Sequence, residues 1–157
     1  SDLIRLYKGR DIIGTEVGAA AKNVIGIAAG FLDGAGLSSL KGSLMARGAR
    51  EIARLIHAMG GNELSAYGLC HLGDYEATLF SAHSHNRMFG ECFIKGKPYS
   101  QLAEGASTVK ALIRLGEEYG VDLPICRTVN DVLYHGCKPQ QALDHLFSRS
   151  VKGEFYL

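Results

Sequence analysis

The sequence predicts a single all-α domain that begins with one short strand. Its 157 residues are 46% hydrophobic and 21% charged, a composition and size that suit one globular core. Apolar residues recur at three- and four-residue spacings over most of the chain, as they do in helices that bury one face. Alternating apolar and polar residues, which indicate a half-buried strand, occur at Leu3–Tyr7. We therefore expect residues 1–9 to be a linker strand and residues 10–157 to be the helical domain.

The strand needs a neighbour outside this sequence. A lone strand cannot satisfy its own backbone hydrogen-bonding groups. We therefore expect Leu3–Tyr7 to complete the edge of a sheet that belongs to a preceding domain.

The first helix is expected over Ile12–Leu32, and it carries a stripe of glycines. They recur at multiples of four residues: Gly14, Gly18, Gly26 and Gly30. Each glycine inside a helix costs about 1 kcal/mol relative to alanine, so this stripe needs a packing reason. Lys22 lies on the same stripe. We expect its amine to stand in a groove of bare backbone that a ligand can reach; the alternative is a lysine that extends into water.

The later helices follow from the same spacing and from end signals. They are expected over Leu40–Met59, over Val109–Tyr119, from Pro124 to Leu133 and from Pro139 to Phe147. Glycines follow the first three of these helices, and prolines open the last two, where a first-turn proline loses no hydrogen bond.

Charge, hydropathy and cysteine spacing exclude several classes of function. The formal net charge is +1 with acids and bases mixed, so no nucleic-acid partner is expected. The longest apolar run, Val24–Leu32, is far shorter than the roughly 20 residues of a membrane span. No cysteine pair has C-x-x-C spacing, which indicates reduced thiols of a cytoplasmic protein: Cys70, Cys92, Cys126 and Cys137.

A second segment rich in polar side chains is GLCHLGDYEATLFSAHSHNRMFG, residues 68–90. Asp74 follows a glycine in a turn, and Thr78 lies four residues on. The run Ser84–Arg87 combines hydroxyl, amide and backbone N–H donors at a helix start, which is the chemistry that an anionic group needs. The alternative is a capped helix with solvated polar residues.

Metal-ligand residue types also occur in this segment, but their spacing matches no zinc pattern: Cys70, His71, His83 and His85. We therefore expect no metal site.

Four stretches, in this order, carry a family resemblance: IIGTEVGAAAKNVIGIAAGFLDGAG, MARGAREIARL, GLCHLGDYEATLFSAHSHNRMFG and AEGASTVKAL. Together they resemble the C-terminal, substrate-binding domain of NAD(P)-dependent sn-glycerol-3-phosphate dehydrogenase. The resemblance implies a helical domain like that of 6-phosphogluconate dehydrogenase. Its partner would be the chain's own N-terminal Rossmann domain, which holds the NAD or NADP; no G-x-G-x-x-G follows a strand in this sequence. A homodimer is a further expected assembly.

The resemblance implies the reversible reduction of dihydroxyacetone phosphate, which supplies a precursor for glycerophospholipids. Lys22 would be the catalytic acid and base at the C2 oxygen. The implied substrate-binding residues are Lys22, Asn23, Asp74, Thr78, Ser84, His85 and Asn86. The implied cofactor contacts are His85, Leu102 and Glu104.

Three departures from the family pattern leave alternatives open. His85 stands where the family has an arginine, His71 replaces a glycine three residues before Asp74, and the connection from residue 90 to Glu104 is shorter. A diverged, non-catalytic helical module that binds a phosphorylated metabolite or mediates dimerisation is one alternative. A related dehydrogenase that acts on another small acid is a second.

Overall fold

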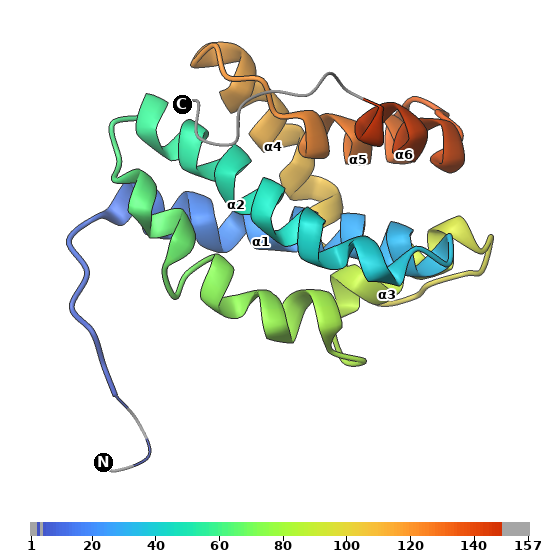
Figure 1. Cartoon of the computed structure of the whole chain (residues 1–157), viewed down its shortest axis with the longest axis horizontal. Helices are drawn as coiled ribbons and strands as arrows, with labels where there is room; N and C mark the ends of the chain where they lie inside the picture. The colour runs from blue at the N-terminus through green and yellow to red at the C-terminus, as the bar shows by residue number, and fades with distance from the viewer. Residues whose placement is uncertain (1–2, 4, 149–157) are drawn as a thin grey trace.

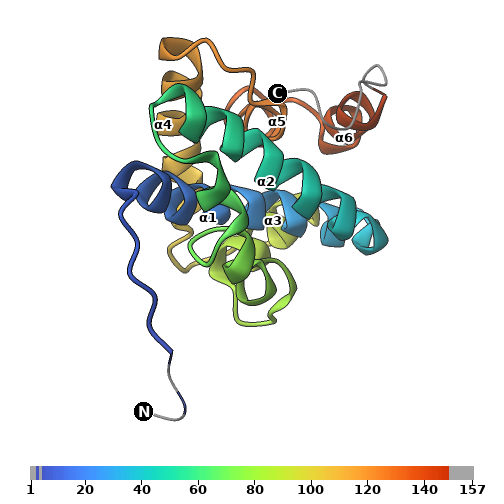
Figure 2. The ribbon, with the colours of Figure 1, turned by 60° about the vertical axis from the view of Figure 1, so that its left-hand side comes forward.

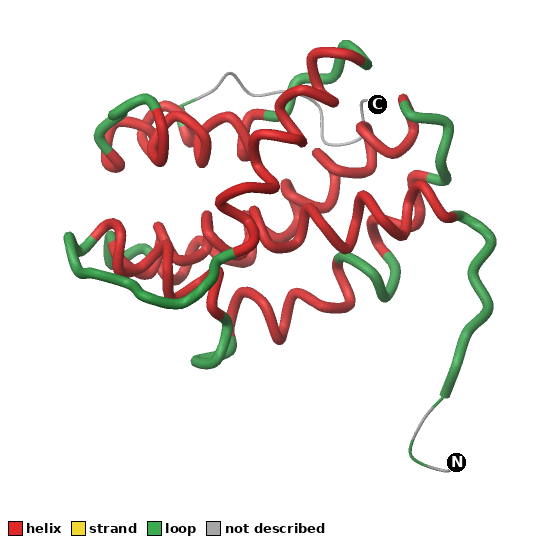
Figure 3. Tube along the Cα trace, turned by 180° about the vertical axis from the view of Figure 1, so that it is seen from behind, coloured by secondary structure: helices red, strands yellow, loops and turns green. Residues whose placement is uncertain are grey.

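A computed structural model of the chain describes residue 3 and residues 5–148, and this part is all helical, as predicted (Figure 3). Its α-helices are α1 (Ile12–Gly34), α2 (Lys41–Ala58), α3 (His85–Ile94), α4 (Glu104–Glu118), α5 (Pro124–Tyr134) and α6 (Pro139–Phe147). Short helical turns join them: η1 (Ser38–Leu40), η2 (Glu63–Tyr67), η3 (Leu72–Asp74) and η4 (Glu76–Phe80). The predicted helices agree with these bounds, except that α4 begins at Glu104 instead of Val109.

Helix α1 is the central helix, with α2, α3, α4 and α5 packed against it, and α6 packs on α5 (Figures 1 and 2). Its most extensive packing is against α3, followed by α4 and α2. From Val24 to Leu32 every residue is buried. Among the described residues α1 alone is long and apolar enough to cross a membrane, but a core helix passes the same test.

The glycine stripe allows other segments of the chain to approach α1 closely. A Cβ on Gly30 would overlap the α3 backbone at Arg87, and a Cβ on Gly90 would overlap the carbonyl of Ile27. A Cβ on Gly26 would lie 2.8 Å from the Thr78 methyl carbon. The stripe therefore has a packing reason, and the open ligand groove expected along it is wrong: the chain's own residues cover these glycines.

A buried carboxylate joins α2 to α5. Glu51 of α2 is 1% exposed, and its two oxygens accept the backbone N–H groups of Ile125 (2.8 Å) and Cys126 (3.0 Å). These donors belong to the first turn of α5, where they lack partners within the helix. Burial raises the pKa of Glu51 to about 7, although both hydrogen bonds oppose this shift.

The strand expected over Leu3–Tyr7 is not formed. Leu3 lies in a turn, and residues 5–10 have no regular structure and lead away from the helices (Figure 1); Ile4 lies outside the described residues. Leu6 and Tyr7 are 89% and 68% exposed. A strand requires a neighbouring strand for its backbone groups, and the described part of the chain contains none.

Candidate functional site

Lys22 and Asp74 form an ion pair at the middle of α1. The Nζ atom of Lys22 donates a hydrogen bond to Oδ2 of Asp74, the last residue of η3. Their side chains are 25% and 34% exposed, so the pair reaches solvent from a half-buried position. The alternative of a lysine extended freely into water is therefore wrong, because a carboxylate 52 residues away in the sequence holds the amine.

An amide network lies next to this pair and joins three helices. Asn86 of α3 donates from Nδ2 to Oδ1 of Asn23 (3.1 Å), and Asn23 donates from Nδ2 to Oε2 of Glu104 (3.3 Å). The Oδ1 atom of Asn86 accepts the backbone N–H of Gly105 (2.9 Å). Because Asn23 directly follows Lys22, the network brings Asn86 and Glu104 to the same stretch of α1.

Thr78 and Ser84 take structural positions close to these residues. Thr78 is buried, with its methyl against Gly26, one turn beyond Lys22. Ser84 is the N-cap of α3, and its Oγ accepts the backbone N–H of Arg87 at 3.4 Å. The capped helix expected at Ser84 is therefore present.

His85 is an exposed residue of the first turn of α3. Its Nδ1 lies 2.9 Å from the hydroxyl of Tyr99, whose ring packs on Phe89 with centroids 6.0 Å apart. Tyr99 is not among the residues predicted for this site, because it lies 14 residues from His85 in an irregular connection without any periodic signal. Leu102, further along this connection, is 76% exposed.

Arg87 belongs to a charge cluster at the C-terminal end of α1. Its guanidinium donates to Asp33 (2.8 Å), to Glu91 (2.8 Å) and to the carbonyl of Ser81 (3.0 Å), and its side chain is 12% exposed. Lys41 also binds Asp33, at 2.6 Å. Burial opposes the charge of Arg87, but the bonds to the two carboxylates outweigh it and raise the pKa of the guanidinium. Arg87 thus holds α1 and α3 together.

The ion pair and the amide network lie in a segment that matches a known protein family. The family described as "NAD-dependent glycerol-3-phosphate dehydrogenase C-terminus" matches residues 11–144. The chain belongs to this family. All five residues of the ion pair and the amide network lie within the matched range: Lys22, Asn23, Asp74, Asn86 and Glu104.

Relatives in the glycerol-3-phosphate dehydrogenase family are similar over nearly the whole chain. Glycerol-3-phosphate dehydrogenase [NAD(P)+] of Thermus thermophilus is 42% identical over 156 residues, 96% of this chain and 48% of the relative. That of Geobacillus kaustophilus is 41% identical over 158 residues, 96% of this chain and 46% of the relative. The chain thus spans about half the length of the curated relatives it matches.

A solved structure confirms the helical fold. The crystal structure of glycerol-3-phosphate dehydrogenase (GpsA) from Coxiella burnetii superposes with a TM-score of 0.87 at 32% sequence identity. The superposition covers 92% of this chain and 47% of that chain. The resemblance inferred from the sequence motifs is therefore confirmed.

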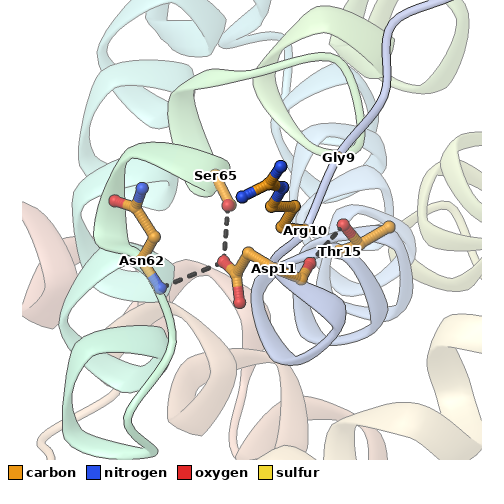
Figure 4. Close-up of a pocket in the computed structure, with 6 residues that line it drawn as sticks. All are labelled: Gly9, Arg10, Asp11, Thr15, Asn62 and Ser65. Atoms are coloured by element: carbon orange, nitrogen blue, oxygen red, sulfur yellow. Dashed lines mark hydrogen bonds between the residues drawn. The ribbon is translucent and has the colours of Figure 1, made fainter.

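A pocket lies at the N-terminal end of α1, and its lining includes neither Lys22 nor Asp74 (Figure 4). It is lined by Gly9, Arg10, Asp11, Thr15, Asn62 and Ser65. Asp11 is the N-cap of α1, and its carboxylate already accepts hydrogen bonds from Gly14 N–H (3.0 Å), Asn62 N–H (3.0 Å) and Ser65 Oγ (2.6 Å). These bonds, that from Ser65 above all, lower the pKa of Asp11. The carboxylate therefore anchors the start of α1.

The metal-ligand residue types of residues 70–85 do not meet in this family member. Among the described residues no three His, Cys, Asp or Glu side chains group so as to hold a metal ion. Cys70 donates to the carbonyl of Ser65 at 3.2 Å, and both ring nitrogens of His71 have protein partners.

Proposed function

We propose that the chain is the substrate-binding and catalytic part of an NAD(P)-dependent glycerol-3-phosphate dehydrogenase. The reaction is the reversible reduction of dihydroxyacetone phosphate to sn-glycerol 3-phosphate, which feeds glycerophospholipid synthesis. The observation that carries this proposal is the half-buried Lys22–Asp74 pair beside the Asn23–Asn86–Glu104 network.

Lys22 acts as the acid and base at the C2 oxygen. Reduction of a ketone places negative charge on its oxygen, and an ammonium group can give that oxygen a proton. In the reverse direction the neutral amine takes the proton from the alcohol. Asp74 holds the Nζ atom in place from one side, so the amine has a defined position for this transfer.

The phosphate of the substrate binds at the N-terminus of α3. The first-turn N–H groups of a helix and its positive dipole end favour an anion. Ser84, His85 and Asn86 supply a hydroxyl, an imidazole and an amide there, and Asn86 connects this end of α3 to Asn23. Thr78 supports the site by packing on Gly26. The same donors argue against a dehydrogenase for unphosphorylated small acids.

The NAD(P) contacts of this half are assigned to Leu102, Glu104 and His85. The exposed side chain of Leu102 fits a flat aromatic ring, Glu104 binds Asn23 next to Lys22, and His85 adds an exposed imidazole at the start of α3. The bound cofactor supplies or accepts a hydride at C2.

An N-terminal Rossmann domain is the proposed partner, since the chain spans about half the length of the NAD(P)-dependent relatives it matches and such a domain would hold the dinucleotide. We assign residues 1–9 to the linker that joins the two domains and residues 10–157 to the helical domain. We further propose a cytoplasmic enzyme that forms a homodimer.

Substitution of Lys22 by methionine in the full-length protein tests the proposal. Methionine keeps the length and removes the proton donor, so kcat is expected to fall by at least about a hundredfold. Lys95→Met is the matched control, because Lys95 also pairs with a carboxylate, Glu91, and lies outside the site. Near-normal turnover of the Lys22 variant would refute the assignment. Binding of the substrate by a wild-type protein without turnover would favour the non-catalytic module.

A further inference from the structure

His71 and Tyr75 form a buried hydrogen-bonded pair beneath the Lys22–Asp74 site. Both residues have 0% exposure. Nδ1 of His71 lies 2.8 Å from the carbonyl oxygen of Gly18, and Nε2 lies 2.5 Å from the hydroxyl of Tyr75. The two rings meet edge to face, with centroids 4.7 Å apart.

The partners define the proton positions on this imidazole. A carbonyl oxygen only accepts hydrogen bonds, so Nδ1 of His71 carries the proton and donates it to Gly18. Nε2 is then the acceptor for the O–H of Tyr75. Burial lowers the pKa of His71 to about 4, so the ring is neutral at physiological pH. The imidazole acts here as a rigid, uncharged connector with one donor and one acceptor.

This connector joins the loop that carries Asp74 to the helix that carries Lys22. Gly18 lies one turn before Lys22 on α1, and a Cβ on Gly18 would lie 3.2 Å from the Cβ of His71. The backbone N–H of Asp74 binds the carbonyl of His71 at 3.1 Å, and Tyr75 directly follows Asp74. His71 and Tyr75 therefore hold the chain on both sides of Asp74, whose carboxylate binds the Lys22 amine.

We propose that His71, supported by Tyr75, is a positioning residue that sets the geometry of the Lys22–Asp74 pair. The proposal rests on the function proposed above. The His71 ring with its two hydrogen bonds, to Gly18 and to Tyr75, is called the clamp below. A misplacement of about 1 Å in a catalytic group can lower a rate about a hundredfold.

Two isosteric substitutions separate the two hydrogen bonds. In His71→Asn the amide nitrogen can take the place of Nδ1 and keep the bond to Gly18, whereas the bond to Tyr75 is lost. In His71→Gln the amide oxygen can take the place of Nε2 and keep the bond to Tyr75, whereas the bond to Gly18 is lost. Each variant thus removes one of the two bonds and keeps the other. Val129→Ala, in the core of α5, controls for a general loss of stability.

Kinetics of the full-length enzyme test the clamp. We expect kcat of His71→Gln to fall at least about tenfold, with KM for dihydroxyacetone phosphate changed less than about twofold. His71→Asn is expected to keep kcat within about threefold of wild type, because the link to α1 remains. Equal kcat values for the two variants, or a loss in KM alone, would overturn the positioning role.

Nitrogen NMR of the His71 ring in the 157-residue chain gives a readout that needs no turnover. A neutral ring protonated at Nδ1 from pH 5 to 8 is expected. A ring protonated at Nε2, or one that becomes charged in this range, would overturn the clamp whatever the enzyme does. If the full-length wild-type protein lacks dehydrogenase activity while the ring behaves as expected, the proposed function fails and the clamp remains.

Discussion

At the scale of single residues, the imidazole of His85 is the exposed ionisable group at the proposed phosphate site. An arginine carries a permanent charge and can bind a phosphate through two parallel N–H groups, which an imidazole cannot do. We therefore expect His85→Arg in the full-length enzyme to lower KM for dihydroxyacetone phosphate and to tighten binding by about 1–2 kcal/mol. KM measured for both proteins at the same pH is the test.

Two controls belong to this experiment. The substrate phosphate itself titrates near pH 6, so both proteins are compared at one pH well above 6, where the phosphate keeps the same charge. Arg87→Ala is expected to lower the free energy of unfolding by about 1–3 kcal/mol, because Asp33 and Glu91 lose a partner. Identical KM values for wild type and His85→Arg, together with a large rise of KM in Arg87→Ala, would transfer the phosphate contact to Arg87.

The sequence predicts the residues of this site better than their contacts. Lys22 and Asp74 could be singled out because a lysine among glycines and an acid in a glycine turn are unusual. Their pairing could not, since 52 residues separate them. Tyr99 and the buried partners of His71 gave no signal, because hydrogen bonds between irregular segments leave no periodic pattern. The run from Ser84 to Arg87 likewise gave no indication that the Arg87 guanidinium binds Asp33.

At the scale of helices, the crossing of α1 and α3 depends on Gly30 and Gly90. A methyl group at Gly30 would overlap backbone atoms of α3, which cannot move aside as a flexible side chain can. We expect Gly30→Ala to lower the free energy of unfolding of the chain by about 3 kcal/mol or more. Gly42→Ala is the matched control: Gly42 lies in α2 with nothing within 4 Å of an added Cβ.

Urea unfolding of both glycine variants measures this difference. The control is expected to be neutral or more stable by up to about 1 kcal/mol, because alanine favours the helix. Equal effects at positions 30 and 42 would show that helix propensity, rather than close packing, explains the stripe.

Helix bounds could be predicted because caps and apolar spacing are local. Gly60, Gly120 and Gly136 have positive φ after α2, α4 and α5, as residues that follow a helix end often do. The strand at Leu3–Tyr7 could not be tested by pattern alone, because a strand forms only against a partner. The glycine stripe predicts that something packs closely on α1. Its spacing does not show whether a ligand or another helix of the same chain does so.

At the scale of the whole molecule, two buried groups make stability depend on pH in opposite directions. Glu51 has a pKa of about 7 in the fold against an ordinary value of 4.5, mainly because of burial. In that window the native state holds a proton that the unfolded chain releases, so stability from Glu51 falls as pH rises. His71 has a pKa of about 4 against 6.5, again because of burial. There the unfolded chain binds the extra proton, so stability from His71 rises with pH.

Between about pH 4.5 and 6.5 these two contributions oppose each other, each changing by about 1.4 kcal/mol per pH unit. The wild-type chain is therefore expected to show a nearly flat free energy of unfolding there. The acids with lowered pKa values, Asp11, Asp33 and Glu91, add their dependence mainly at lower pH. When one of these two buried groups is replaced, the pH dependence that comes from the other is no longer cancelled. The free energy of unfolding of Glu51→Gln is expected to rise by about 2–3 kcal/mol from pH 4.5 to 6.5, and that of His71→Asn to fall by a similar amount.

Urea unfolding at pH 4.5, 5.5 and 6.5 measures these slopes. Val129→Ala, which removes buried methyl groups and no ionisable group, is expected to lower stability equally at each pH, because its effect comes from packing alone. The slopes of Glu51→Gln and His71→Asn must have opposite signs, whatever each variant costs in absolute stability. Parallel curves for wild type and both variants would mean that neither buried group changes its proton affinity on folding. If only one variant shows a slope, the pH dependence comes from the buried group that this variant retains. The expectation that the two contributions cancel in the wild-type chain would then be wrong.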